Sequence, residues 1–123
     1  MVDVEEFKEQ IRNTISQEYN LEFIGDDFNK IVDKISEIKA KKIYEWVERV
    51  TKDEITPIMK NDPKRKYKGI PLPKLMSFRK ELQIDGKDYR IMLIKIKNSY
   101  YIEFQLGDHK YYDGLRKNLG LKT

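Results

Sequence analysis

The chain has 123 residues, 37% of them charged and 39% hydrophobic, and its formal net charge is +4. This length predicts a single domain, residues 1–123, that buries roughly two-thirds of its unfolded surface. The absence of cysteine excludes a disulfide scaffold and a thiolate metal site, and because we find no basic and apolar leader and no long apolar run, we expect a cytoplasmic protein with no membrane span.

The N-terminal part of the chain predicts one helix and one strand. Apolar residues recur at helical spacing after the capping residue Asp3, which predicts an amphipathic helix over residues 4–18. The apolar stripe of this helix is narrow, so residues 1–19 are expected to form an accessory extension of a core that spans residues 20–120. A short strand over residues 20–24 opens that core.

Two further helices are expected after this strand. Asp27 is placed to cap the first of them, and the apolar pattern then loses its phase at residues 36–41. A tight turn in this stretch explains the shift better than one long helix. The next helix is expected to end around Thr51 to Lys52, or to continue weakly until Pro57 stops it, and its Trp46 should lie in the core.

Residues 57–76 contain all four prolines and are expected to connect the helices to the next strand without regular structure. Positive charge is concentrated here and at the start of that strand. Such a field suits a polyanion, of which a phosphate backbone is the commonest, although a solvated basic loop is the alternative. The lysines and arginines between residues 60 and 80 are Lys60, Lys64, Arg65, Lys66, Lys68, Lys74, Arg79 and Lys80.

Residues 77–107 predict a three-stranded antiparallel meander. Asp85-Gly86 lies between two alternating runs, and these two residue types tolerate the positive φ angles of a type I′ hairpin turn. A second turn at Asn98-Ser99 then places Phe104 opposite Leu93, whereas a three-residue loop here would swap the faces of the third strand. The apolar face that results needs a cover, which the helices supply, and it consists of Phe78, Leu82, Tyr89, Ile91, Leu93, Ile102, Phe104 and Leu106.

The opposite face of the meander is expected to be solvated, as one face of an antiparallel sheet often is. After the meander, residues 108–120 predict a short terminal helix with Gly120 as its C′ residue. The expected fold is therefore α+β: a helical hairpin packed on a small antiparallel sheet, in the order α-β-α-α-β-β-β-α.

Most catalytic signatures are absent from this sequence. We find no phosphate-binding glycine loop, no nucleophile elbow and no HExxH motif, and the single histidine is too few for a typical zinc site. The densest group of cations and aromatic residues arises where Arg79, the basic connection and residues 109–112 converge. Arginine and lysine bind phosphate oxygens, and tyrosine offers a stacking surface or a proton.

These residues resemble a known family. The approach Gly-Ile-Pro-Leu-Pro-Lys-Leu, the strands Phe-Arg-Lys-Glu-Leu-Gln-Ile and Tyr-Arg-Ile, and the finish Leu-Gly-Asp-His-Lys-Tyr-Tyr are similar to the RelE/ParE superfamily of type II toxins. The resemblance covers about residues 21–120. It implies a RelE-like toxin of a toxin-antitoxin system, a hydrolase that inhibits translation by cleaving free or ribosome-bound mRNA and that is neutralised by a cognate antitoxin.

The resemblance also implies roles for individual residues. A metal-independent endoribonuclease of this kind needs no cofactor, because the 2′-hydroxyl of the RNA is its nucleophile. Arg79 would bind the scissile phosphate, His109 would transfer a proton and Lys110 would contact phosphate. The family tyrosine falls later in the chain, so either Tyr111 or Tyr112 would replace it, Tyr112 in catalysis or Tyr111 in RNA binding. The residues that would bind RNA along the loop and strand are Lys64, Arg65, Lys66, Lys68 and Lys80.

Two alternatives stay open at this point. One keeps the fold without the cleavage: a ParE-like inhibitor, or a degenerate relative that binds nucleic acid or a protein partner. The other is a basic RNA-binding module outside this family. Arg90 of the Tyr-Arg-Ile motif is expected to pair with Glu81 across the hairpin, which favours a structural role for it.

Overall fold

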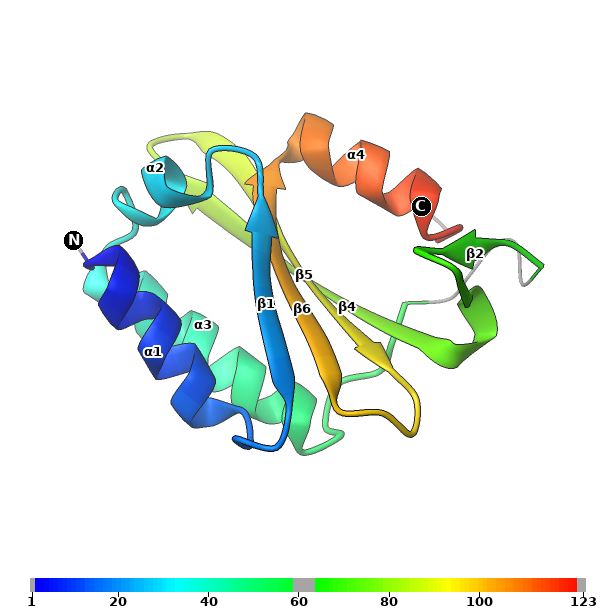
Figure 1. Ribbon diagram of the computed structural model, residues 1–123. Coiled ribbons are helices and arrows are strands. Elements are labelled where there is room, and N and C mark those ends of the chain that lie inside the picture. The colour runs from blue at the N-terminus through cyan, green and yellow to red at the C-terminus, as the bar shows by residue number, and fades with distance from the viewer. Residues whose placement is uncertain (1, 59–63, 122–123) are drawn as a thin grey trace.

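The computed structural model describes residues 2–58 and 64–121, which form a four-stranded sheet with helices on both faces (Figure 1). The strand order is β1 (Asn20–Gly25), β6 (Tyr101–Asp108), β5 (Lys87–Ile96) and β4 (Leu75–Ile84). Strands β4, β5 and β6 form the expected antiparallel meander, but β1 runs parallel to β6. The sheet is therefore mixed rather than antiparallel. Within residues 2–58 and 64–121, no helix combines the length and apolar character needed to cross a membrane.

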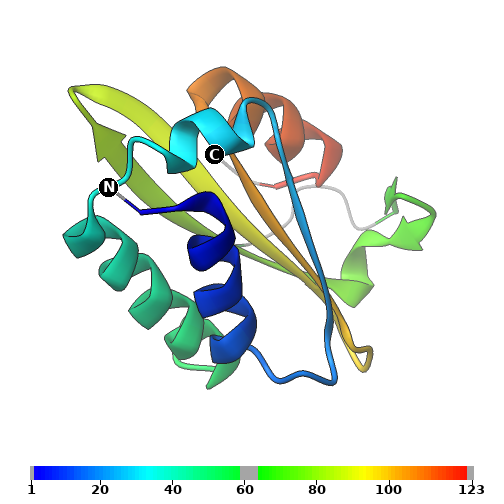
Figure 2. The ribbon, with the colours of Figure 1, turned by 60° about the vertical axis from the view of Figure 1, so that its left-hand side comes forward.

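Helix α1, Val4–Thr14, is shorter than predicted and more deeply packed. Asp3 caps it as expected by accepting a hydrogen bond from the Glu6 backbone N–H at 3.2 Å, but the chain is already extended at Ile15. Figure 2 shows α1 lying beside α3, Glu37–Thr51, on the sheet. Phe7 is fully buried and its ring contacts Phe104 of β6, so α1 belongs to the main core rather than to an accessory layer.

The helical hairpin is formed by α2, Phe28–Val32, and α3, Glu37–Thr51, after strand β1, Asn20–Gly25. The turn between the helices ends at Ser36, which caps α3, so it comes earlier than predicted. Asp27 does not cap α2 through its side chain and instead adopts a positive φ of 55°. The end of α3 at Thr51 is confirmed.

The register of the meander is confirmed over β4 (Leu75–Ile84), β5 (Lys87–Ile96) and β6 (Tyr101–Asp108). Asp85 and Gly86 both have positive φ angles, as a type I′ turn requires, and Leu93 pairs with both Phe78 and Phe104. All eight residues of the predicted apolar face are buried beneath α1, α2 and α3, and Trp46 of α3 belongs to the same core.

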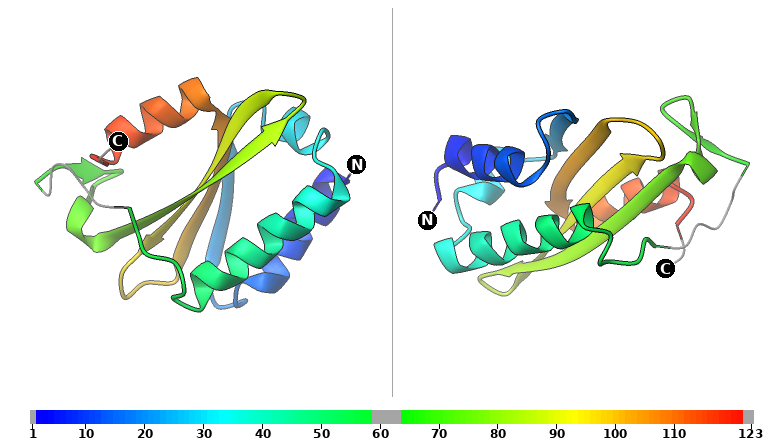
Figure 3. Two further views of the ribbon diagram at one scale, coloured as in Figure 1. Left: turned by 180° about the vertical axis from the view of Figure 1, so that it is seen from behind. Right: turned by 90° about the horizontal axis from the view of Figure 1, so that it is seen from below.

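The second face of the sheet is not solvated, contrary to expectation. Met92 and Ile94 are buried there beneath α4, His109–Asn118, and beneath a small hairpin formed by β2, Lys66–Tyr67, and β3, Ile70–Pro71. The stretch expected to lack regular structure thus contains this hairpin and a 3₁₀ turn, Leu72–Lys74, while Lys60 and Pro63 lie outside the described residues. Exposed side chains on this face lie toward the two edges of the sheet. Edge strand β4, which Figure 3 shows from behind, exposes Arg79, Glu81 and Gln83 there.

Candidate active site

Three arginines surround the side chain of Tyr112 on the second face, and we call them the arginine cluster: Arg79, Arg90 and Arg116. Tyr112 is only 3% exposed. Arg79 donates a hydrogen bond from Nη1 to its hydroxyl oxygen at 3.2 Å. The guanidinium carbons of Arg90 and Arg116 lie 5.9 and 5.8 Å from its ring centroid, within the range of cation–π contacts. All three arginines therefore contact the same buried side chain, Tyr112, and lie close together around it.

The start of α4 fixes the position of Tyr112. Asp108 ends β6 and caps the helix at once by accepting a hydrogen bond from the Tyr111 backbone N–H at 2.9 Å. A Cβ atom on Gly107 would lie 2.4 Å from a ring carbon of Tyr111, so a glycine is required for this ring to lie against the strand. The next residue, Tyr112, then lies over β5, where Arg90 is located.

His109 lies at the rim of the arginine cluster. Its Nδ1 atom is 3.1 Å from Oδ2 of Asp113, whose Oδ1 is 3.4 Å from Nη2 of Arg116. The His109 ring approaches the Tyr112 ring edge to face, with centroids 6.4 Å apart. Asp113 therefore orients the imidazole through Nδ1, while about half of the His109 side chain is exposed to solvent.

The arginine cluster carries an excess of positive charge. Its carboxylate partners are Asp113 and Glu81, the latter 3.7 Å from Nη2 of Arg90 and mostly exposed. Three guanidinium groups therefore face two carboxylates. The hydrogen bond to the Tyr112 hydroxyl raises the pKa of Arg79 above its ordinary value, so Arg79 is charged throughout the physiological range. The predicted cross-strand pairing of Arg90 with Glu81 is confirmed.

A second polar group lies deeper on the same face, and we call it the Glu103 network. The carboxylate of Glu103 is fully buried in β6 and accepts hydrogen bonds from Tyr67 Oη at 2.8 Å and Lys68 Nζ at 2.7 Å. Gln105 Nε2 donates to the same carboxylate at 2.8 Å, and the Tyr101 hydroxyl donates to it as well. Every acceptor position of this carboxylate is thus occupied, and the network fastens the β2–β3 hairpin to the sheet.

The Glu103 network shifts the pKa of its members in opposite directions. Burial by itself raises the pKa of Glu103, but the hydrogen bonds from Lys68, Tyr101, Tyr67 and Gln105 outweigh it, and the net pKa is lowered. Burial and the bond to the carboxylate raise the pKa of Tyr67 and of Tyr101. At neutral pH the network therefore consists of an ionised carboxylate and neutral tyrosines.

The arginine cluster with His109 can bind a phosphodiester and transfer a proton. Within the described residues, no group of three or more histidine, aspartate or glutamate side chains is arranged to hold a metal ion. No family model, curated protein or solved structure matches this chain. Its function is therefore inferred from these side chains and their geometry.

Three of the four residues predicted to be catalytic are brought together: Arg79, His109 and Tyr112. Lys110 is not, because a turn of about 100° per residue places it about 160° around the helix from Tyr112. It lines a hollow on the far side of α4 with Asp26. Lys80 is also separated from Arg79, since neighbouring strand residues point to opposite faces and Lys80 lies on the helical-hairpin side.

The other residues predicted to bind RNA lie on or beside the β2–β3 hairpin. Lys64, Arg65 and Lys66 are exposed there, whereas Lys68 is tied to Glu103. The Tyr111 hydroxyl donates to Oε1 of Gln105, so its ring is part of the packing between α4 and the sheet. A hollow of about 410 Å³ between this hairpin and α4 is lined by Arg65, Lys66, Lys68 and Tyr111, among others.

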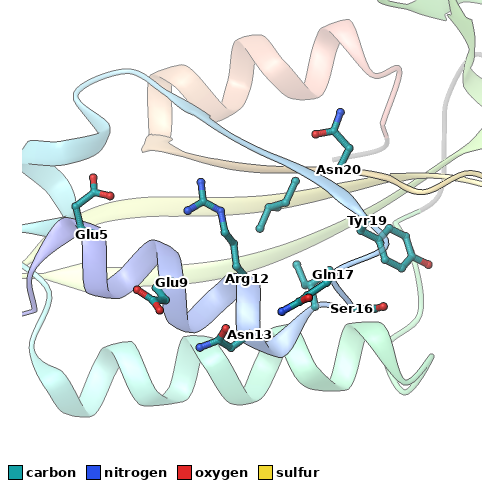
Figure 4. Close-up of a pocket in the computed structure, with 10 residues that line it drawn as sticks. Glu5, Glu9, Arg12, Asn13, Ser16, Gln17, Tyr19 and Asn20 are labelled. Carbon is teal, nitrogen blue, oxygen red and sulfur yellow. The ribbon is translucent and has the colours of Figure 1, made fainter.

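Sequence reasoning missed two members of the site, Asp113 and Arg116. The signal was present, because residues 109, 113 and 116 share one side of a helix at i, i+4 and i+7. A larger hollow of about 540 Å³ lies elsewhere, between α1 and the start of β1 (Figure 4). Its polar lining includes Glu5, Glu9 and Arg12, and it contains no part of the arginine cluster.

Proposed function

We propose that this chain is a RelE-like toxin of a type II toxin-antitoxin system, a metal-independent endoribonuclease that cleaves mRNA and so inhibits translation. The observation that carries the proposal is the arginine cluster with His109 at its rim. A trigonal-bipyramidal phosphoryl group gathers negative charge on its equatorial oxygens, and preformed cationic donors are the groups that stabilise such charge.

The element order supports the proposal. After the N-terminal helix, which lies outside the resemblance, come a strand, a helical hairpin and a three-stranded meander, with the small β2–β3 hairpin inserted before the meander. Apart from that insertion, this is the order of strand, two helices and three strands that the resemblance to the RelE/ParE superfamily implies. The terminal helix carries His109 directly after the last strand, and both His109 and the strand arginine Arg79 of that resemblance contact Tyr112.

The reaction is an attack by the RNA on itself. The 2′-hydroxyl oxygen forms a bond to the adjacent phosphorus, the bond from phosphorus to the 5′-oxygen breaks, and a 2′,3′-cyclic phosphate results. The hydroxyl proton passes to solvent water, and His109, in its protonated form beside Asp113, gives its proton to the leaving 5′-oxygen. Arg79 binds the phosphate with the planar fork of its guanidinium group.

Tyr112 has a positioning role in this scheme. Its hydroxyl is buried and accepts the hydrogen bond from Arg79, so it orients the guanidinium group rather than touching the RNA. The exposed lysines and arginine of the β2–β3 hairpin would bind the flanking RNA backbone, and a cognate antitoxin would neutralise the toxin by covering the arginine cluster.

The chemical groups at the ends of the cleaved RNA test the proposal. The chain is expressed from an inducible promoter in a bacterial host, growth is followed, and the new 5′ ends of cellular mRNA are mapped and tested for a 5′-hydroxyl group. We expect growth arrest together with new 5′-hydroxyl ends. Normal growth and intact mRNA, with the protein present in folded form, would contradict a ribonuclease.

One observation favours a second candidate, a non-catalytic relative that binds nucleic acid or a protein partner. Among residues 2–58 and 64–121, the group placed at the rim to transfer a proton is a single histidine, His109, which is already paired with Asp113. Such a protein would bind RNA, with an affinity that falls steeply as salt is raised, and would form no cleavage product.

The placement of Lys110 gives a separate prediction. Because this side chain points away from the arginine cluster, Lys110→Ala should cleave RNA at close to the wild-type rate. The sequence alone assigns Lys110 a phosphate contact and so predicts a loss of cleavage instead. Single-turnover cleavage of a synthetic RNA by the two proteins checks this. A loss comparable to that of a cluster variant would place the substrate on the outer side of α4.

A further inference from the structure

A pocket of about 480 Å³ lies at the end of the sheet where β5 turns into β6, and we call it the β5–β6 pocket. Its lining residues are Tyr19, Met76, Lys95, Ile96, Asn98, Ser99 and Tyr100. Figure 1 shows this turn at the bottom of the sheet, at the other end from the start of α4. From Arg90 to Ile96 along β5, at ~3.3 Å per residue, the separation is roughly 20 Å.

The β5–β6 pocket presents an exposed aromatic ring in a fixed position. Tyr100 is 61% exposed, and its ring meets the Tyr19 ring edge to face with centroids 5.4 Å apart. Its backbone is held as well, since the carbonyl oxygen of Tyr100 accepts a hydrogen bond from the Asn20 backbone N–H at 2.6 Å. Tyr19 itself lies at the start of β1 (Figure 4). A large ring that is rigid and still exposed is suited to stacking on a flat ligand.

The same pocket contains a cation. Lys95 is only 8% exposed as a whole residue, and its Nζ lies 5.7 Å from the Tyr19 ring centroid. Among the described residues its Nζ has no hydrogen bond or ion pair, and it is not one of the fully buried unpaired atoms. The stem of Lys95 is therefore buried while its ammonium group reaches the pocket, where it can contact an anion. Lys97, exposed at the next turn, adds positive charge nearby.

We propose that the β5–β6 pocket binds one nucleotide of single-stranded RNA, with the base stacked on Tyr100 and a phosphate beside Lys95. Stacked aromatic rings with cations along the backbone path are the usual chemistry of single-strand binding. This inference rests on the proposed function, because it makes the pocket a second contact for the same RNA strand. The pocket would hold the substrate without taking part in the cleavage step.

Binding of a substrate analogue that cannot be cleaved tests the pocket. The probe is fluorescein-labelled 2′-O-methyl oligouridylate, and affinity is measured by fluorescence anisotropy. Tyr100→Ala should weaken binding about 5- to 100-fold, since one base-stacking contact is of that size, and Lys95→Met should weaken it because the charge beside the phosphate is lost. Tyr100→Phe should bind as the wild type does because it keeps the ring. Ile38→Ala is the matched control, an exposed apolar residue of α3 distant from the pocket in sequence.

The outcomes separate this inference from the proposed function. If Tyr100→Ala binds the probe as tightly as the wild type does, the pocket is not an RNA contact, and RNA cleavage by the wild type is untouched by that result. If Tyr100→Ala loses affinity while the wild type cleaves no RNA, the pocket stands and the ribonuclease fails. Circular dichroism of Lys95→Met shows whether this variant folds. Photocrosslinking of an oligouridylate to the wild type, mapped by mass spectrometry, tests the contact with Tyr100 without any substitution. The absence of any crosslink in the pocket would also overturn the inference.

Discussion

Arg79→Ala should lower the rate of RNA cleavage by at least about 100-fold, the usual effect of removing one preformed donor to a developing negative charge. Arg79 is the exposed member of the arginine cluster, and its hydrogen bond to Tyr112 holds the guanidinium group in one orientation. Its loss removes both the charge and the planar pair of donors. The measurement is single-turnover cleavage of a synthetic RNA, with the 2′,3′-cyclic phosphate product quantified.

Two variants make the Arg79 experiment specific. Arg79→Lys keeps the charge but loses the fork that binds two phosphate oxygens, so we expect a rate between those of the wild type and Arg79→Ala. Lys117→Ala removes an exposed cation from the outer side of α4 and should cleave at the wild-type rate. If Arg79→Ala cleaved as fast as Lys117→Ala, the arginine cluster would not be the site of cleavage.

The strands were more predictable than the helices, and the reason is local. Asp85-Gly86 sets the register of β4 against β5 by its own backbone preference, and the alternation of apolar residues then fixes which face each side chain takes. The limits of α1 and α2 depend on packing instead. Ile15 continues the apolar stripe of α1 but lies in extended chain, because tertiary contacts decide where a short helix ends.

The second face of the sheet could not be predicted from strand alternation alone. Met92 and Ile94 are apolar and are buried there, but Arg79, Glu81 and Glu103 share the face and suggested exposure to solvent. What the sequence did not reveal is that the basic stretch around Tyr67 folds back over Glu103. A buried carboxylate becomes favourable only when its partners arrive from elsewhere in the chain.

The candidate site was predictable where residues follow a strand pattern and was missed where they follow a helix. Arg79 was identified as a cation on β4, and His109 as a group directly after β6. Lys110 was grouped with them because it is adjacent in sequence, although helical geometry turns it away. Asp113 and Arg116 were overlooked although they share the side of α4 on which His109 lies.

Glu103→Gln should destabilise the fold by about 2 kcal/mol, because charge-assisted hydrogen bonds are the strong ones and a buried donor left without an acceptor costs about 1–3 kcal/mol. The amide keeps the size of the side chain but presents its own N–H donors to Lys68 or to the tyrosines. Urea unfolding at neutral pH measures the loss. Glu22→Gln is the matched control, since Glu22 also lies near the Tyr101 hydroxyl but is exposed, and it should change stability little.

The pH dependence of this effect has a definite sign. The pKa of Glu103 is lower in the folded chain than its ordinary value, so its ionised form stabilises the fold at neutral pH. That contribution is present above the unfolded pKa of about 4.3 and is lost as the pH falls through the lower folded pKa. The stability difference between the wild type and Glu103→Gln should therefore shrink as the solution is acidified.

Hydrogen exchange locates where the stability is lost. Because the Glu103 network fastens the β2–β3 hairpin through Tyr67 and Lys68, the amides of residues 66–71 should exchange faster in Glu103→Gln, while those of the β4–β5 hairpin should change much less. A difference in stability that did not vary with pH, or a uniform acceleration across the sheet, would show that the carboxylate acts through core packing rather than through its charge. Faster exchange confined to residues 66–71 would instead identify Glu103 as the residue that holds the β2–β3 hairpin against the second face, beside the hollow next to α4.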